Sequence, residues 1–193
     1  MIMNKDFHGN IRPLIDLSTP DEQELNSGKR PVLETCHNAK TIAGIDFDAI
    51  REKWYPAQAG KNVPCSVDAL IFQGEKIYLV EFKSGGTNNP IRKIYDSVMM
   101  LIEHDNRNFQ TMRKAATYII VSPNFNDSEN CDKAILRATY YANHEYSQEP
   151  WNDPRFKSPD KLGLRKLEGI IVAKTYCMSP NMFDKFVKHE NWG

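Results

Sequence analysis

Two acidic side chains and a lysine near the middle of the chain have the types and spacing needed to hold a divalent cation. Asp68 lies within the apolar run of residues 65–72, whereas Glu81 and Lys83 mark the end of a second run, residues 77–82. The short segment between the runs contains a glycine, a pattern typical of two strands joined by a tight turn. The chemistry of this segment therefore depends on how the two strands pair.

A two-residue loop of Gly74 and Glu75 sets the expected register of this hairpin, because glycine at the first loop position suits a type II′ turn. That register places Asp68 directly opposite Glu81, with Cβ atoms about 4.5–5.5 Å apart. Like charges at such positions repel each other, so the pair requires a compensating group. Because side chains alternate between the two faces of a strand, Lys83 shares a face with Glu81.

A divalent cation would compensate the two carboxylates. Mg²⁺ binds one or two carboxylates together with water molecules and phosphate oxygens, and a bound cation can promote phosphodiester hydrolysis. In the simpler interpretation, Glu81 and Lys83 form a solvated strand end and Asp68 only begins the other strand. We favour the functional interpretation because these groups end an otherwise apolar hairpin, which the Gly85-Gly86 loop follows.

The segment VDALIFQGEKIYLVEFKSGG resembles the signature of the PD-(D/E)XK nuclease superfamily, an Asp, a variable spacer and Glu-x-Lys on two paired strands. The resemblance extends over residues 68–122, because the helix and the strand expected after the hairpin follow in the family's order. Val67 stands where the motif has proline, at a position that varies in the family. The resemblance implies a restriction-endonuclease-like core.

The resemblance also implies roles for individual residues. The expected ligands of Mg²⁺ or Mn²⁺ are two carboxylates and one backbone carbonyl: Asp68, Glu81 and Phe82. With Asp68 and Glu81, Lys83 completes the catalytic set, in which it would orient or deprotonate the attacking water. Beside two carboxylates Lys83 should stay protonated without metal, so stabilising the transition state as a cation is its safer role. Family members often add a glutamate from an upstream helix, and Glu34 and Glu52 are both candidates.

Basic residues outside the motif are candidates for contact with nucleic acid. Some members of the family place a polar residue near the substrate on the helix after the hairpin, so Lys93 and Arg92 are candidates for contact with a phosphate. The alternative is a solvated helix face. A second candidate is a basic stretch that follows several aromatic residues, a combination that suits backbone contact and base stacking. Its members are Arg155, Lys157, Lys161, Arg165 and Lys166. A charge run of this kind is also common in solvated loops.

Hydrophobic periodicity in the rest of the chain predicts alternating helices and strands. Helices are expected over residues 31–55, after Asn88-Asn89-Pro90, over residues 128–144 and after Ser179-Pro180, and strands over residues 116–122 and 168–176. A central mixed β-sheet flanked by helices buries all these apolar faces, so the expected fold class is α/β (α+β). We interpret residues 1–30 as an N-terminal arm or lead-in and residues 31–193 as a single nuclease-like domain.

Composition limits the class of protein further. The 193 residues suit one domain, and 25 basic residues balance 25 acidic ones, so any nucleic-acid site must be a local patch. No apolar run approaches the roughly 20 residues of a membrane span, and the first residues lack the apolar core of a signal peptide. The four scattered cysteines form no CxxC pair, so we expect reduced thiols and a cytoplasmic location.

These features predict a metal-dependent nuclease that hydrolyses phosphodiester bonds, with Mg²⁺ or Mn²⁺ as cofactor and DNA favoured over RNA. A chain of this size that cuts both strands would need to dimerise, so a homodimer is expected on that ground. One alternative is a non-catalytic nucleic-acid-binding or regulatory module that keeps the nuclease fold, although facing carboxylates argue against it. Another is a hydrolase of smaller phosphate esters, which would not need residues 155–166 for activity.

Overall fold

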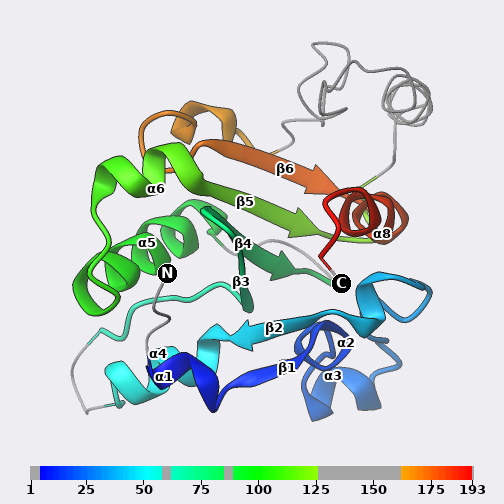
Figure 1. Cartoon of the computed structure of the whole chain (residues 1–193). Coiled ribbons are helices and arrows are strands. Elements are labelled where there is room, and N and C mark those ends of the chain that lie inside the picture. The colour runs from blue at the N-terminus through cyan, green and yellow to red at the C-terminus, as the bar shows by residue number, and fades with distance from the viewer. Residues whose placement is uncertain (1–4, 58–61, 85–88, 126–161, 193) are drawn as a thin grey trace, which may run out of the picture.

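Six strands form one mixed β-sheet whose strand order follows the chain, from β1 at one edge to β6 at the other (Figure 1). This computed structural model describes residues 5–57, 62–84, 89–125 and 162–192. The strands are β1 (Ile11–Pro13), β2 (Ala43–Asp46), β3 (Ala69–Gln73), β4 (Lys76–Phe82), β5 (Ala116–Val121) and β6 (Lys174–Met178). The helices are α1 (Lys5–His8), α2 (Leu14–Leu17), α3 (Glu22–Asn26), η1 (Ala39–Thr41), α4 (Phe47–Trp54), α5 (Pro90–His104), α6 (Phe109–Ala115), η3 (Arg165–Leu167) and α8 (Pro180–His189). Strands β1 to β4 pair antiparallel and β4 to β6 pair parallel, so the predicted mixed sheet flanked by helices is confirmed.

The hairpin of β3 and β4 forms in the predicted register. Gly74 has a φ of +59°, whereas Glu75 is not among the residues with positive φ, as a type II′ turn requires. The pairing extends to the residues next to Asp68 and Glu81, which therefore face each other at the open end of the hairpin. Local turn geometry thus decides which side chains meet at this point.

One face of the sheet packs against α4, α5 and α6. Leu79 of β4 and Tyr118 of β5 share a buried cluster with Val98 of α5 and Met112 of α6. Burying such side chains contributes roughly 1.5–3 kcal/mol each relative to leaving them exposed. Because Glu81 lies two residues beyond Leu79 on β4, its side chain points to the same face as these helices.

The opposite face of the sheet packs against α2 and α8. Leu14 of α2 and Phe183 of α8 belong to a second buried cluster, which includes Tyr78 of β4. Helix α8 begins as predicted, since the Ser179 side chain accepts a hydrogen bond from the backbone N–H of Met182 and proline follows Ser179. The sheet is therefore covered on both faces.

Residues 5–30 take part in the fold. Phe7 and Leu14 are fully buried, and β1 forms the edge of the sheet beside β2. Helix α2 packs closely on β2 at Gly44. A Cβ added to this glycine would lie 2.7 Å from Cδ2 of Leu14. The segment predicted as a lead-in thus supplies an edge strand and part of the core.

Two elements differ from the expectation. Residues 31–55, predicted to be helical, contain η1 and strand β2 before α4 begins, and a strand of four residues is too short for its alternation to be recognised. The strand predicted for residues 168–176 begins only at Lys174, since the chain turns near Gly169, whose φ is +70°. Both differences arise where the local sequence signal is weak.

Other expectations are confirmed or lie outside the described residues. The helix predicted after Asn89 and the strand predicted over residues 116–122 correspond to α5 and β5. The helix predicted over residues 128–144 lies outside the described part of the chain. Within that part, no helix is both long and apolar enough to cross a membrane.

Candidate metal centre

Asp68 and Glu81 meet at the end of the hairpin, as their register requires. Glu81 is fully buried, and the Asp68 side chain is 18% exposed. Asp68 Oδ2 accepts a hydrogen bond of 2.6 Å from the backbone N–H of Phe82, and the Asp68 carbonyl accepts one of 3.2 Å from the N–H of Phe47. Backbone N–H groups of α4 and β4 therefore hold Asp68 in place.

Two lysines compensate the charge of this carboxylate pair. Lys83 Nζ lies 2.5 Å from Glu81 Oε1. Lys93 Nζ donates to both oxygens of Glu81, at 2.7 and 2.9 Å, and lies 3.5 Å from Asp68 Oδ1. Two ammonium groups thus surround one fully buried carboxylate. Such pairing is needed because a buried charge is costly unless it is paired.

The start of α5 brings Lys93 to the hairpin. Asn89, with a φ of 46°, caps the helix by accepting a hydrogen bond from the Arg92 N–H, and Pro90 occupies the first turn. Ile94 is fully buried on the sheet side of the same turn. Lys93 was predicted as a phosphate contact, and in this structure its ammonium lies on the two carboxylates. The Arg92 side chain instead bonds Asp96, at 3.2 Å.

The environment shifts the pKa values of the cluster in a consistent way. Burial and the charge of Glu81 raise the pKa of Asp68 to about 8, despite the opposing effects of Lys93 and the Phe82 N–H. Burial would lower the pKa of Lys93, yet the charges of Asp68 and Glu81 outweigh it and hold that pKa above its usual value. Without a divalent cation, the site therefore favours a protonated Asp68 near neutral pH and a charged Lys93.

The raised pKa of Asp68 makes the stability of the metal-free protein depend on pH. The carboxyl binds its proton more tightly in the folded chain than in the unfolded one, whose pKa is near 3.8, so its contribution to folding is lost as pH rises toward about 8. Between about pH 5 and about pH 8, we expect the free energy of unfolding of the wild type to fall by ~1–3 kcal/mol more than that of Asp68→Asn.

Urea unfolding of the wild type and Asp68→Asn at several pH values, in chelator, measures this difference. Parallel pH profiles for the two proteins would contradict it. Because metal must displace the proton, Mn²⁺ binding near neutral pH should also release protons, which calorimetry in buffers of different ionisation enthalpy detects.

Asp68 also borders a cavity of about 330 Å³ that is rich in acidic side chains. Its charged lining residues are Arg12, Asp16, Asp21, Glu24, Asp46, Asp48 and Asp68. Among these described lining residues Arg12 is the one basic side chain, and its Nε lies 3.4 Å from Asp46 Oδ2. A cavity lined by acids attracts cations. Its negative charge would repel a phosphate unless bound cations compensated that charge.

Asp48 is one of the five acids upstream of Asp68 that line this cavity. It lies in the first turn of α4, accepts a hydrogen bond from the Ser66 hydroxyl, and its charge helps to raise the pKa of Asp68. Neither expected glutamate lines the cavity: Glu34 pairs with Arg30 at 3.4 Å and Glu52 with Arg51 at 3.1 Å. The pattern Asp46-Phe47-Asp48 carried a helix-cap signal that could have located this acid.

A buried tyrosine hydroxyl completes the surroundings of the pair. Tyr118 is fully buried, and burial, followed by the charges of Glu81 and Asp68, raises its pKa well above the usual value. Its hydroxyl has no hydrogen-bond partner among the described residues. Leaving such a group unpaired costs ~1–3 kcal/mol, so a water molecule beside the carboxylates would stabilise it. No local signal in the sequence marks Tyr118, because it reaches the pair from β5, a strand distant in sequence from Asp68.

The donor set fits Mg²⁺ better than a metal that requires a closed protein cage. No group of three or more His, Cys, Asp or Glu side chains in the described parts of the chain is arranged to hold a metal ion. Asp68 and Glu81 supply two carboxylates, and the Phe82 carbonyl belongs to the same strand end. Mg²⁺ commonly keeps several water or phosphate ligands beside one or two carboxylates, so the chemistry of this donor set fits it.

The two described members of the predicted basic stretch lie away from the carboxylates. Arg165 and Lys166 lie in η3, beside the first residues of β6, whereas Glu81 lies near the last residue of the parallel strand β4. They are therefore at the other end of the sheet. Arg155, Lys157 and Lys161 lie outside the described residues.

Comparison of the chain with protein-family models, with curated proteins and with solved structures finds no match in any of the three.

Proposed function

We propose that this chain is a metal-dependent nuclease of the PD-(D/E)XK type that hydrolyses phosphodiester bonds, in DNA in preference to RNA. The observation that supports this most directly is the facing pair of Asp68 and Glu81 with Lys83 on the same strand end, 2.5 Å from Glu81. Carboxylates that repel each other destabilise a hairpin, so their presence on one face favours a functional role.

Each residue of the cluster suits a step of such hydrolysis. Asp68, Glu81 and the Phe82 carbonyl would hold Mg²⁺ or Mn²⁺, which supplies activation of water and stabilises negative charge on the phosphate. Lys83 would orient the attacking water and stabilise the transition state as a cation. Arg12, at the wall of the cavity, would donate hydrogen bonds to a neighbouring phosphate.

The partner and the location follow from the same proposal. Cutting both strands would call for a homodimer, so we include a second copy of the chain among the proposed partners. Three cysteines in the described residues, Cys36, Cys65 and Cys177, are free thiols, as expected of a protein in the reducing cytoplasm.

One observation favours the alternative, a non-catalytic nucleic-acid-binding or regulatory module. Lys83 and Lys93 already neutralise Glu81, so the pair does not need a metal ion to remain folded. In that case Asp68 and Glu81 would serve as a structural ion-pair network, and Mn²⁺ would not bind to them.

Plasmid cleavage with matched variants tests the proposal. Purified wild type, Glu81→Gln and Glu75→Gln are incubated with supercoiled plasmid, linear duplex and single-stranded DNA, with RNA for comparison, in Mg²⁺, Mn²⁺ or chelator. Glu75 is an exposed residue at the turn of the same hairpin, so its variant controls for the loss of one carboxylate. Calorimetric titration with Mn²⁺ accompanies each cleavage assay.

We expect metal-dependent cutting by the wild type and by Glu75→Gln, with cutting and Mn²⁺ binding both lost in Glu81→Gln. Cleavage that persists in chelator would contradict the proposed chemistry. Absence of both cleavage and Mn²⁺ binding in the wild type would leave the non-catalytic module as the better interpretation.

A further inference from the structure

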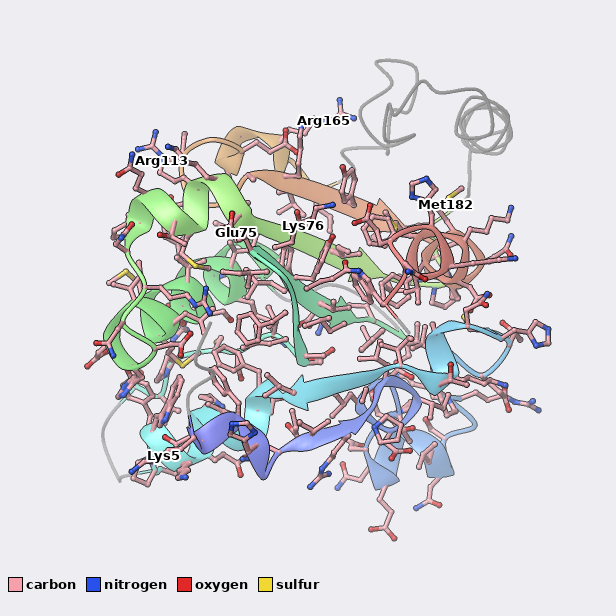
Figure 2. All side chains as sticks on the ribbon, viewed as in Figure 1. Lys5, Glu75, Lys76, Arg113, Arg165 and Met182 are labelled. Atoms are coloured by element: carbon pink, nitrogen blue, oxygen red, sulfur yellow. The ribbon has the colours of Figure 1, made fainter. Side chains whose placement is uncertain are left out.

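A second cavity lies where β4, β5 and β6 begin. It has a volume of about 220 Å³ and is lined by residues from these strands, α6 and α8. Its charged and aromatic lining residues are Lys76, Lys114, Lys174, Glu190, Tyr78, Tyr176 and Phe186. Figure 2 shows Lys76 between α6, which carries Arg113, and α8, which carries Met182. We call this hollow the lysine cavity.

The lysine cavity has an excess of positive charge. Its one acid, Glu190, has a side chain that is 6% exposed and accepts hydrogen bonds from Lys76 Nζ at 2.9 Å and from the Tyr78 hydroxyl at 2.5 Å. Lys114 and Lys174 are exposed, and no acidic side chain among the described residues pairs with either ammonium group. Two positive charges are therefore left for an anion.

Strand register brings these cations to one face of the sheet. Tyr78, Thr117 and Lys174 are direct neighbours on β4, β5 and β6, with strands about 4.8 Å apart. Lys76 lies two residues before Tyr78 and so shares its face, and Lys114 approaches from the last turn of α6. Flexible lysine side chains that start about 10 Å apart can converge on a single phosphate group.

An aromatic wall adjoins the cations. Tyr78 and Phe186 are almost fully buried and form the floor, whereas Tyr176 is partly exposed and its ring centroid lies 6.0 Å from that of Phe186. A partly exposed ring held by a buried one offers a surface on which a nucleobase can stack. Cations beside such a ring suit a ligand with both a phosphate and a base.

We propose that the lysine cavity binds the phosphate group of a nucleotide, free or within a single strand, with Tyr176 against the base. This site is separate from the carboxylate pair. Lys76 and Glu81 lie at opposite ends of β4, about 17 Å apart along the strand, and they point to opposite faces of the sheet. A mononucleotide bound there cannot reach Asp68, so the inference does not rest on the nuclease proposal.

Calorimetric titration of the full chain in chelator at low salt tests this site. The probes are inorganic phosphate, deoxyadenosine 5′-monophosphate and a short single-stranded oligonucleotide. The double variant Lys114→Met with Lys174→Met removes the two cations, and Lys5→Met with Lys40→Met removes two lysines elsewhere as a charge-matched control. Tyr176→Leu removes the ring, and Glu81→Gln checks that the carboxylate pair is not involved.

We expect the mononucleotide to bind the wild type more tightly than phosphate does. Its affinity for the double variant of Lys114 and Lys174 should be lower than for the wild type by about tenfold or more. Tyr176→Leu should lower the affinity for the mononucleotide by ~5-fold or more and leave the affinity for phosphate unchanged. If the oligonucleotide binds more tightly than the mononucleotide, the ligand of the site is a single strand. If the mononucleotide binds more tightly, the ligand is a free nucleotide. Absence of binding by every probe, equal affinity for phosphate and mononucleotide, or equal loss in the control variant would overturn the proposal.

Discussion

Replacing Lys83 by methionine is expected to lower the rate of Mg²⁺-dependent cleavage by ~10²- to 10⁴-fold while Mn²⁺ binding is retained. The Lys83 ammonium lies 2.5 Å from Glu81, and in the proposed function it would orient the attacking water and stabilise the transition state. The variant should fold, because the Lys83 backbone N–H still donates to the Val121 carbonyl at 2.9 Å and the side chain is partly exposed.

Single-turnover cleavage and Mn²⁺ titration of the same preparation separate the two effects. Lys5→Met provides the control for removing one lysine, since it lies in α1 and outside the lining of the acidic cavity. If Lys83→Met cuts at the wild-type rate, Lys83 is no part of the catalytic set. If it loses Mn²⁺ binding as well, its role is to hold Glu81 rather than to act on water.

Replacing Lys93 by methionine is expected to weaken the metal-free fold and to strengthen metal binding. Lys93 bonds both oxygens of Glu81 and approaches Asp68, so its ammonium lies where a divalent cation would meet the same carboxylates. Removing it leaves buried negative charge only partly compensated by Lys83, which should cost ~3 kcal/mol in chelator. The metal would no longer displace an ion pair, so the affinity for Mn²⁺ should rise about tenfold or more.

Thermal unfolding with and without Mn²⁺, together with calorimetry, tests this reciprocal effect. Lys93→Arg keeps the charge and should stay closer to the wild type in metal-free stability. Adding Asp68→Asn to Lys93→Met removes one of the repelling charges and should restore part of the lost stability, which gives a double-mutant cycle. Unchanged or weaker Mn²⁺ binding in Lys93→Met would show that the ammonium does not compete with the metal.

Local sequence determined the part of the site that one hairpin contains. Gly74 at the first position of a two-residue turn sets the register, and the two-residue period of a strand then places Asp68 opposite Glu81 with Lys83 on the same face. The cap and proline before α5 are local signals of the same kind. Such features depend on a few neighbouring residues, and they were predicted correctly.

Tertiary structure decided which other groups meet the pair. Asp48 and Arg12 reach the acidic cavity because β1 and β2 add to the sheet beside β3, and neither short strand has enough residues for its alternation to be recognised. Tyr118 arrives through parallel pairing with β4, and Lys93 through packing of α5 on the sheet. Contacts of this kind join residues far apart in the chain, so no local pattern specifies them. The sequence by itself determined the paired carboxylates, and packing of distant elements decided their charge environment.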